Sequence, residues 1–218
     1  FIGSFAIGMV YSALFGLIAV FGAKIGLSIF QISILVFVNT FVGAVFQYPI
    51  GKISDKFDRR SILLVLNLIA IVSLILAFFL GSISFYVLLL FVGIHSGVSL
   101  PYYAVVISHM NDFLEREEIV SGSSTLTLVN ALGMVTGPLL ASGFMAYFGP
   151  YGWFVYMIVV YSLVAPYNFA RIRVGRTSDI YEDNTPSMIV PRTASPVGMQ
   201  LATEQVINKI EEEEEAAT

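Results

Sequence analysis

The sequence contains no cysteine, only two histidines and few charged residues. Of its 218 residues, 12% are charged and 57% are hydrophobic. The absence of cysteine excludes disulfides, thiolate metal sites and a cysteine nucleophile, and two histidines make a histidine-rich metal site a poor expectation. Soluble domains carry about a quarter of charged residues. This chain therefore has too few polar residues to cover a globule that faces water.

Long apolar stretches take the place of the missing charges. A helix needs about 20 apolar residues to cross the hydrocarbon core of a bilayer, and lipid offers its backbone no partner outside the helix itself. The short, alternating segments typical of a membrane barrel do not occur. We predict an all-α membrane protein with six transmembrane helices at residues 3–22, 29–50, 61–80, 84–107, 122–148 and 151–170.

Basic residues gather on one side of this predicted bundle. The opposite side carries Lys24 alone. By the positive-inside rule, both chain ends and the loops at 51–60 and 108–120 are expected in the cytoplasm. The membrane that we expect is a bacterial inner membrane. The basic residues on that side are Lys52, Lys56, Arg59 and Arg60 after the second span, Arg116 after the fourth, and Arg171, Arg173 and Arg176 after the sixth.

The composition changes after the sixth span, which divides the chain into a bundle at 1–170 and a tail at 171–218. The tail contains recurring prolines and a run of five glutamates, Glu211 to Glu215. Such a segment cannot bury much apolar surface, so we expect a mostly disordered cytoplasmic tail. The glutamate run is interpreted as solvated, with binding of a partner as the alternative.

The connection after the second span carries the most specific pattern in the chain. Its residues fit G-x-x-x-D-[RK]-x-G-[RK]-[RK], with Asp58 where the pattern has its second glycine, a position at which aspartate tolerates a turn. Pro49 is expected to weaken the end of the second helix. A generic basic region would explain the charges but not this spacing. The matching residues are Gly51, Asp55, Lys56, Arg59 and Arg60, of which Asp55 and Arg59 would pair if the loop is helical.

This loop resembles the cytoplasmic signature of the major facilitator superfamily. The resemblance extends over residues 1–170 and is closest to the C-terminal half of YcaD-like transporters, on features such as Gly8 and Tyr11 in the first span and Pro101-Tyr102 in the fourth. It implies one half of a twelve-helix fold. The N-terminal six-helix half is then a missing partner, in keeping with a chain that starts inside an apolar run.

The resemblance also implies which helices border a central cavity, namely the first, second, fourth and fifth. His95 shares a helix face with Ser99 and Tyr102. It is either a titratable proton or substrate site or a neutral side chain that bonds two helices. In the first case, His95→Ala should reduce coupled flux more than folding. The candidate substrate or proton residues are Tyr11, Asn39, His95, Tyr103 and Asn130.

The fifth span contains G-x-x-x-G-P, formed by Gly133, Gly137 and Pro138. Two glycines one turn apart let another helix approach closely, and the proline is expected to kink the helix. The pattern looks like the antiporter signature of the superfamily. Close helix packing alone accounts for it, and we favour packing.

The predicted function is transport of a small organic solute by rocker-switch alternating access, extended to proton-coupled efflux. No aspartate or glutamate lies in any predicted span, so proton coupling would need the missing half or His95. The same absence favours the alternative, a non-transporting membrane scaffold or assembly protein. The chain has no nucleotide-binding loop to support direct ATP drive. An enzyme is disfavoured, because no metal-ligand cluster, nucleophile–base set or paired carboxylates lie near one membrane face. We expect membrane lipid, a small-molecule substrate and the missing half as partners, and neither a cofactor nor nucleic acid.

Overall fold

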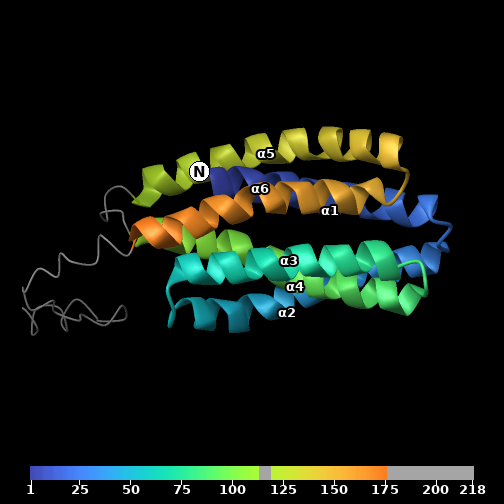
Figure 1. Ribbon diagram of the computed structural model, residues 1–218, viewed down its shortest axis with the longest axis horizontal. Coiled ribbons are helices and arrows are strands. Elements are labelled where there is room, and N and C mark those ends of the chain that lie inside the picture. Colours follow the sequence, from blue (N-terminus) through green and yellow to red (C-terminus); the bar gives the residue numbers. More distant parts are fainter. Residues whose placement is uncertain (113–118, 176–218) are drawn as a thin grey trace, which may run out of the picture. The chain divides into compact units, whose positions relative to one another are not determined.

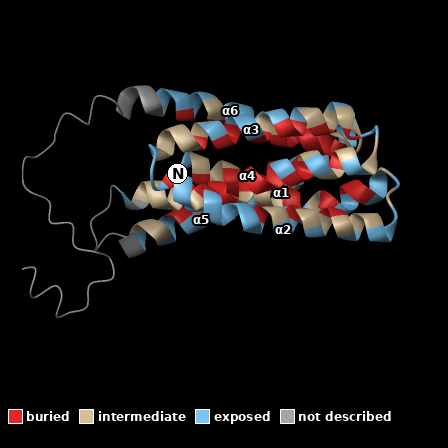
Figure 2. Cartoon of the chain, turned by 90° about the horizontal axis from the view of Figure 1, so that it is seen from below, coloured by how far each residue is buried: buried red, intermediate tan, exposed pale blue. Residues whose placement is uncertain are grey.

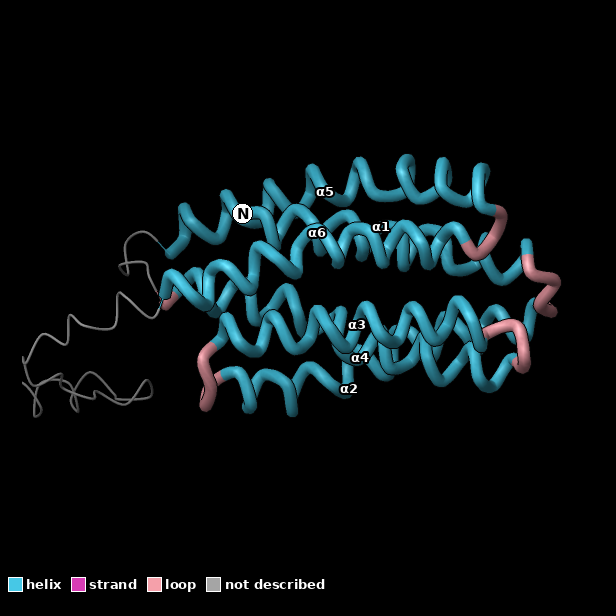
Figure 3. The backbone as a smooth tube through the Cα atoms, in the orientation of Figure 1, coloured by secondary structure: helices cyan, strands magenta, loops and turns pink. Residues whose placement is uncertain are grey.

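The computed structural model describes residues 1–112 and 119–175, and these residues fold into six helices and no strand. Each helix is long and apolar enough to cross a membrane, as predicted. Short connections join them in antiparallel order (Figures 1 and 3). The helices are α1 (Ile2–Lys24), α2 (Ile29–Ser54), α3 (Arg59–Leu80), α4 (Phe85–Asn111), α5 (Ile119–Phe148) and α6 (Gly152–Gly175).

Several helix starts are determined by local polar side chains. Ser28 and Gln31 form a reciprocal capping box at the start of α2, and the Ser84 hydroxyl accepts a hydrogen bond from the Tyr86 N–H at the start of α4. These contacts satisfy backbone donors that a first helical turn leaves without partners. Gly26 and Gly149 adopt positive φ angles of 80° and 73° in the connections before α2 and α6. Glycine adopts this conformation without the steric penalty of a side chain.

The helices extend further than the predicted spans at several ends. α2 passes through Pro49 and Gly51 to Ser54, although these residues were expected to weaken its end near residue 50. A proline has a helical φ and removes only one backbone donor, so α2 continues through it without a break. α6 similarly continues to Gly175, inside the segment predicted as tail. The rest of that tail lies outside the described residues.

Two helix pairs that are not adjacent in sequence form the closest packing. α1 packs most extensively against α5, and α2 against α4, whereas α3 contacts α4 and α6 (Figure 1). If α1, α2 and α3 are taken to correspond to α4, α5 and α6, the α1–α5 pair corresponds to the α4–α2 pair. For this pair the packing of the two three-helix segments is symmetric, as in transporter folds that are built from internal repeats.

The inner faces of the helices are buried and the outer faces are exposed and apolar (Figure 2). α2 and α5 in particular present large side chains such as Phe37, Phe41, Val135 and Leu139 to the surroundings. In water such a surface would favour aggregation, whereas in lipid it is favourable. The chain is accordingly an integral membrane protein.

An aromatic cluster closes the bundle at the end that holds the α5–α6 connection. Phe21 of α1 stacks on Trp153 with ring centroids 4.9 Å apart and meets Phe154 edge-on at 5.0 Å. The Trp153 indole N–H donates a 3.0 Å hydrogen bond to the Ala13 carbonyl. α1 and α6 are thus joined by aromatic packing and by a hydrogen bond that satisfies a buried donor.

Candidate functional site: a charge network and buried polar contacts

The connection between α2 and α3 begins at Asp55 and ends at Asp58. We call the end of the bundle that holds residues 55–58 the basic end. The Asp58 carboxylate caps α3 and accepts hydrogen bonds from the N–H groups of Arg60 and Ser61, at 3.3 and 3.1 Å, and from the Ser61 hydroxyl at 2.8 Å. Its φ is −55°, so this position needs no glycine. Aspartate in place of the pattern's glycine is therefore explained by helix capping.

Partial burial acts to raise the pKa of Asp58, but other contacts outweigh it. The hydrogen bonds from Ser61 and from the Arg60 N–H, together with the positive charge of Arg60, stabilise the ionised carboxylate. The pKa of Asp58 consequently lies below its ordinary value.

Arg59 joins two carboxylates from different helices. Its Nη2 lies 3.2 Å from Oδ1 of Asp55, and its Nε lies 2.9 Å from Oδ2 of Asp112. The Arg59 side chain is only 16% exposed, whereas Asp55 and Asp112 are 69% and 44% exposed. The predicted Asp55–Arg59 pair is present although residues 55–58 are not helical. The i,i+4 spacing did not predict the second contact, from Arg59 to Asp112, which extends the pair into a bridge between α2, α3 and α4.

Each member of this network would be disfavoured in isolation. Asp55 and Asp112 are the C-cap residues of α2 and α4, where the helix dipole is negative, and Arg59 is the first residue of α3, where it is positive. The pairing compensates all three. Arg59 also keeps a buried Nη1 for which the described part of the chain offers no hydrogen-bond partner.

The remaining loop residues of the pattern lie apart from the network. Gly51 has no atom near the position that a side chain would take, so close packing does not require glycine there. Lys56 is exposed. Arg60 turns away to line a cavity between other helices. Lys52 lies 4.8 Å above the ring of Tyr48, in a cation–π contact.

Three of the candidate substrate or proton residues are already buried by the helices of this six-helix bundle. Asn39 is 0% exposed and accepts a hydrogen bond from the Ser96 hydroxyl. Asn130 is 7% exposed and donates a 2.9 Å hydrogen bond to the Ser4 carbonyl. His95, at 1% exposed, completes the set. Side chains enclosed in this way connect helices of the same bundle.

His95 lies against α6 in a polar cluster. The Ser99 hydroxyl is 3.2 Å from Nε2 and 3.4 Å from Nδ1 of the imidazole, and 2.6 Å from the Tyr161 hydroxyl. The rings of His95 and Tyr161 meet edge-on with centroids 5.7 Å apart. The expected face shared with Ser99 is present, whereas Tyr102 bonds instead to Asn168.

Tyr11 and Tyr103 are the two candidates that stay partly exposed. The Tyr11 hydroxyl donates toward the carbonyl oxygens of Ser99 and Leu100, with the Ser99 oxygen at 2.8 Å. The Tyr103 hydroxyl lies 3.5 Å from that of Thr127 on α5. α1, α4 and α5 thus each bring one hydroxyl-bearing side chain to neighbouring positions.

Several residues of this polar framework had no part in the sequence-based prediction. Asn67 donates a 3.2 Å hydrogen bond to the Tyr161 carbonyl and so connects α3 to α6. Asn168 donates to the Tyr102 hydroxyl at 2.9 Å. Asp112 belongs to the charge network. The signal for the two amides was present, since polar residues inside a span need a partner. The described residues contain no group of acidic or histidine side chains that could hold a metal ion.

Glycines permit backbone contact between α1 and α5. A side chain at Gly133 would collide with the Phe5 carbonyl, and one at Gly137 with the Met9 carbonyl and Ser12. Gly8 on α1 faces the Asn130 carbonyl in the same way. This close approach is what the packing interpretation predicts. α5 continues through Pro138 as a single helix.

Comparison with known proteins agrees with this architecture. Residues 1–196 match the Major Facilitator Superfamily. A curated relative, the "Uncharacterized MFS-type transporter YfkF" of Bacillus subtilis (strain 168), is 27% identical over 169 residues, which are 75% of this chain and 41% of the relative. The chain thus spans about two fifths of that relative's length. No solved structure matches significantly. The chain belongs to the Major Facilitator Superfamily, a family of membrane transporters.

Proposed function

We propose that this chain forms one six-helix half, the C-terminal one, of a secondary transporter that moves a small organic solute by alternating access. Family membership supports the class of function. The length of the relative leaves room for a second half, against which the exposed apolar faces of α2 and α5 would pack. Alternating access then consists of rocking one half against the other.

The observation that carries the proposal is the bridge from Arg59 to Asp55 and Asp112. It joins the ends of α2, α3 and α4 through charges that are each placed at an unfavourable helix end. No helix stabilises the charge at its own end, so each charge depends on a partner from another helix. Such ion pairs can form in one access state and break in the other. We assign this network the role of a latch that favours one of the two access states.

For the substrate, we propose contact with Tyr11, Tyr103 and Thr127. These residues lie on α1, α4 and α5, and none of the three is fully buried. Asn39, His95 and Asn130 take a structural role in this proposal, because other helices of the same bundle enclose them. Proton-coupled efflux then requires the other half to supply the titrating carboxylate, since the described spans contain none.

We place the basic end in the cytoplasm, so that both ends of the chain face it in a bacterial inner membrane. Lys52, Lys56, Arg59 and Arg60 lie at this end, and the opposite connections contain no basic residue beyond Lys24 at the end of α1. This distribution is the one that the positive-inside rule assigns to the cytoplasmic side.

The latch is tested in the complete protein with Asp112→Asn, Asp55→Asn and the double variant. Hydrogen exchange of amides in the α2–α3 connection reports the latch without knowledge of the substrate. We expect Asp112→Asn to raise the exchange rate several-fold. The double variant should change it by less than the sum of the two single effects, because both remove partners of one arginine. Lys56→Gln is the control, because it changes the charge of an exposed side chain by the same magnitude with opposite sign.

Transport itself is tested by a susceptibility screen with toxic organic solutes. Cells that express the complete protein should differ in growth from cells that carry Asp55→Asn. Without the latch, the access state that it favours is harder to reach, so conformational exchange is slower, while membrane insertion is unaffected. Identical growth with every solute, together with no flux in proteoliposomes of the folded protein, would contradict transport and favour the scaffold alternative.

A further inference from the structure

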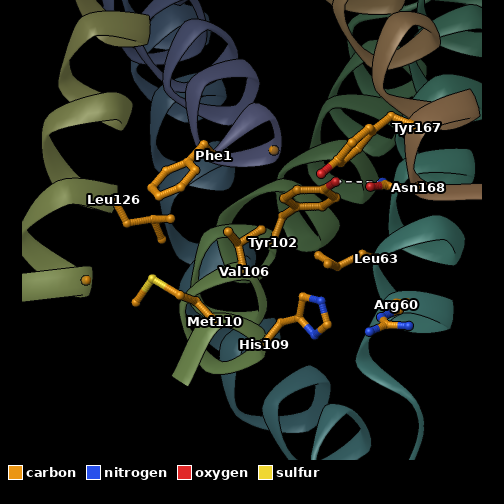
Figure 4. A pocket seen from close by; sticks show the side chains of 12 residues that line it. Phe1, Arg60, Leu63, Tyr102, Val106, His109, Met110, Leu126, Tyr167 and Asn168 are labelled. Carbon is orange, nitrogen blue, oxygen red and sulfur yellow. Dashed lines mark hydrogen bonds between the residues drawn. The ribbon is translucent and has the colours of Figure 1, made fainter. Parts of the chain in front are cut away.

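A small cavity of about 110 Å³ lies between α2 and α4 at the basic end of the bundle. We call it the α2–α4 cavity. Since a water molecule takes up about 30 Å³ in the liquid, it has room for a small ion together with some water. It is separate from a larger cavity of about 350 Å³ between α1, α3, α4, α5 and α6. In that larger cavity, the polar side chains of Tyr102 and Asn168 bond to each other (Figure 4).

The polar side chains that line the α2–α4 cavity have no such partners. Ser54 is only 3% exposed, yet its hydroxyl makes no hydrogen bond within residues 1–112 and 119–175. The side chains of Gln47 and Ser108, which also line the cavity, make none with the described residues either. A buried polar group that lacks a partner costs free energy. The α2–α4 cavity is therefore suited to a polar occupant.

The lining of the α2–α4 cavity can supply several oxygen atoms to such an occupant. Ser54 and Ser108 contribute hydroxyl oxygens, and Gln47 contributes an amide oxygen. The Asp55 carboxylate also lines the cavity. Its Oδ1 pairs with Arg59, whereas its Oδ2 has no partner in the described part of the chain. Carboxylate, amide and hydroxyl oxygens are the ligands that hard metal cations prefer.

The charges beside the α2–α4 cavity also favour a cation. Asp55 and Asp112 carry two negative charges and share the single positive charge of Arg59, so one negative charge is left over. α2 and α4 both end here, and the C-terminal end of a helix dipole is negative. The lysines of this region do not line the cavity, since Lys52 lies over an aromatic ring and Lys56 is exposed.

We propose that the α2–α4 cavity binds one monovalent metal cation, for which Na⁺ is the probe. A single surplus negative charge matches a single positive charge. A calcium site takes about six to eight oxygen ligands, more than this lining supplies from its side chains. The ligands of the cation are water and the side-chain oxygens of Gln47, Ser54, Asp55 and Ser108. Binding involves this bundle alone and does not depend on transport.

Binding is measured on the complete purified protein with radioactive Na⁺ in a scintillation proximity assay. We expect saturable retention that Ser54→Ala weakens about tenfold, as loss of one contact with a charged partner predicts. Ser108→Ala should weaken retention in the same way. Ser82→Ala removes an exposed hydroxyl from the connection before α4. This control should leave the affinity unchanged.

Thermal unfolding gives a second readout of the same site. The melting temperature of the parent should be higher in NaCl than in choline chloride, because a ligand that binds only the folded state stabilises it. Equal ionic strength keeps the screening of the charge network the same in both salts. In choline chloride, Ser54→Ala should melt with the parent, since its hydroxyl has no partner to lose and alanine is favourable in a helix. The difference between the salts should shrink in this variant.

Each of three results would overturn the cation site. Absence of saturable retention, with equal melting temperatures in the two salts, would indicate that the cavity holds water only. Retention that Ser54→Ala and Ser108→Ala both leave unchanged would place the ion elsewhere in the complete protein. Stronger displacement by Mg²⁺ than by unlabelled Na⁺ would contradict a monovalent ion. Retention is measured without a solute, so its failure leaves the proposed transport function untouched.

Discussion

At the scale of single residues, polar side chains in this bundle serve mainly to join helices. Ser4, Asn67 and Asn168 each bond across a helix boundary, and so does Trp153. Within lipid, an unpaired polar group has no water to bond to. Each of these residues therefore stabilises one particular arrangement of neighbouring helices. Replacement of any of them should mainly lower the free energy of unfolding.

Asp58 offers a residue-scale test at the start of α3. Asp58→Ala removes the cap and should lower the free energy of unfolding by about 1 kcal/mol. Circular dichroism during thermal unfolding in detergent measures the change. Asp58→Asn retains a capping oxygen and should stay close to the parent. Equal destabilisation by both variants would count against capping as the role of this residue.

The lowered pKa of Asp58 also gives stability a pH dependence of known sign. Because the folded state holds the carboxylate ionised more firmly than the unfolded state, the contribution is complete above the ordinary pKa of an aspartate. It is lost as pH falls through the lower folded value. The melting temperature of the parent should therefore fall more steeply below pH 4 than that of Asp58→Asn. Identical acid profiles would contradict this.

His95 is the residue for which the structure changes the expectation most. Its burial against Ser99 and Tyr161 favours the structural alternative over a proton site. His95→Ala should destabilise the protein by roughly 2–5 kcal/mol, as for other large-to-small changes in a packed core. The yield of monodisperse protein should fall, while flux per folded molecule persists. Normal yield with lost flux would favour the interpretation of His95 as a proton or substrate site.

At the scale of helices, the α1–α5 contact depends on the absence of side chains. Gly137→Ala would place a Cβ against the Met9 carbonyl and should cost about 1–3 kcal/mol through strain. Gly143→Ala lies in the same helix where no atom is near, and it should stabilise slightly through helix propensity. Thermal unfolding of the two variants side by side measures the difference. Similar shifts in both would contradict close packing.

Helices were predictable from hydropathy, but their partners were not. The six spans follow from apolar length, because lipid forces such stretches into helices. The glycines at 133 and 137 indicated that some helix approaches closely, yet spacing within α5 contains no information about which one. The Asp55–Arg59 pair followed from proximity in sequence. Asp112 could not be found in this way, because its contact with Arg59 exists only once α2, α3 and α4 are assembled.

At the scale of the whole molecule, the sidedness of the bundle can be tested with introduced thiols. The chain has no cysteine, so a single replacement gives one labelling site in a cysteine-free version of the complete protein. Lys56→Cys and Ser82→Cys are both exposed, in the connections before α3 and α4. An impermeant maleimide applied to spheroplasts should label Ser82→Cys at once and Lys56→Cys only after permeabilisation. The reverse pattern would invert the proposed topology.

The α1–α5 pairing also has a consequence for biogenesis. Ser4 bonds to Leu126, a residue 122 positions later in the chain, so α1 enters the membrane long before its partner is synthesised. At about 5–20 residues per second, the delay is on the order of ten seconds. Throughout this time the face of α1 around Gly8, which later packs against α5, needs a temporary neighbour such as lipid or an insertase. Assembly of the bundle is therefore timed by the arrival of α5.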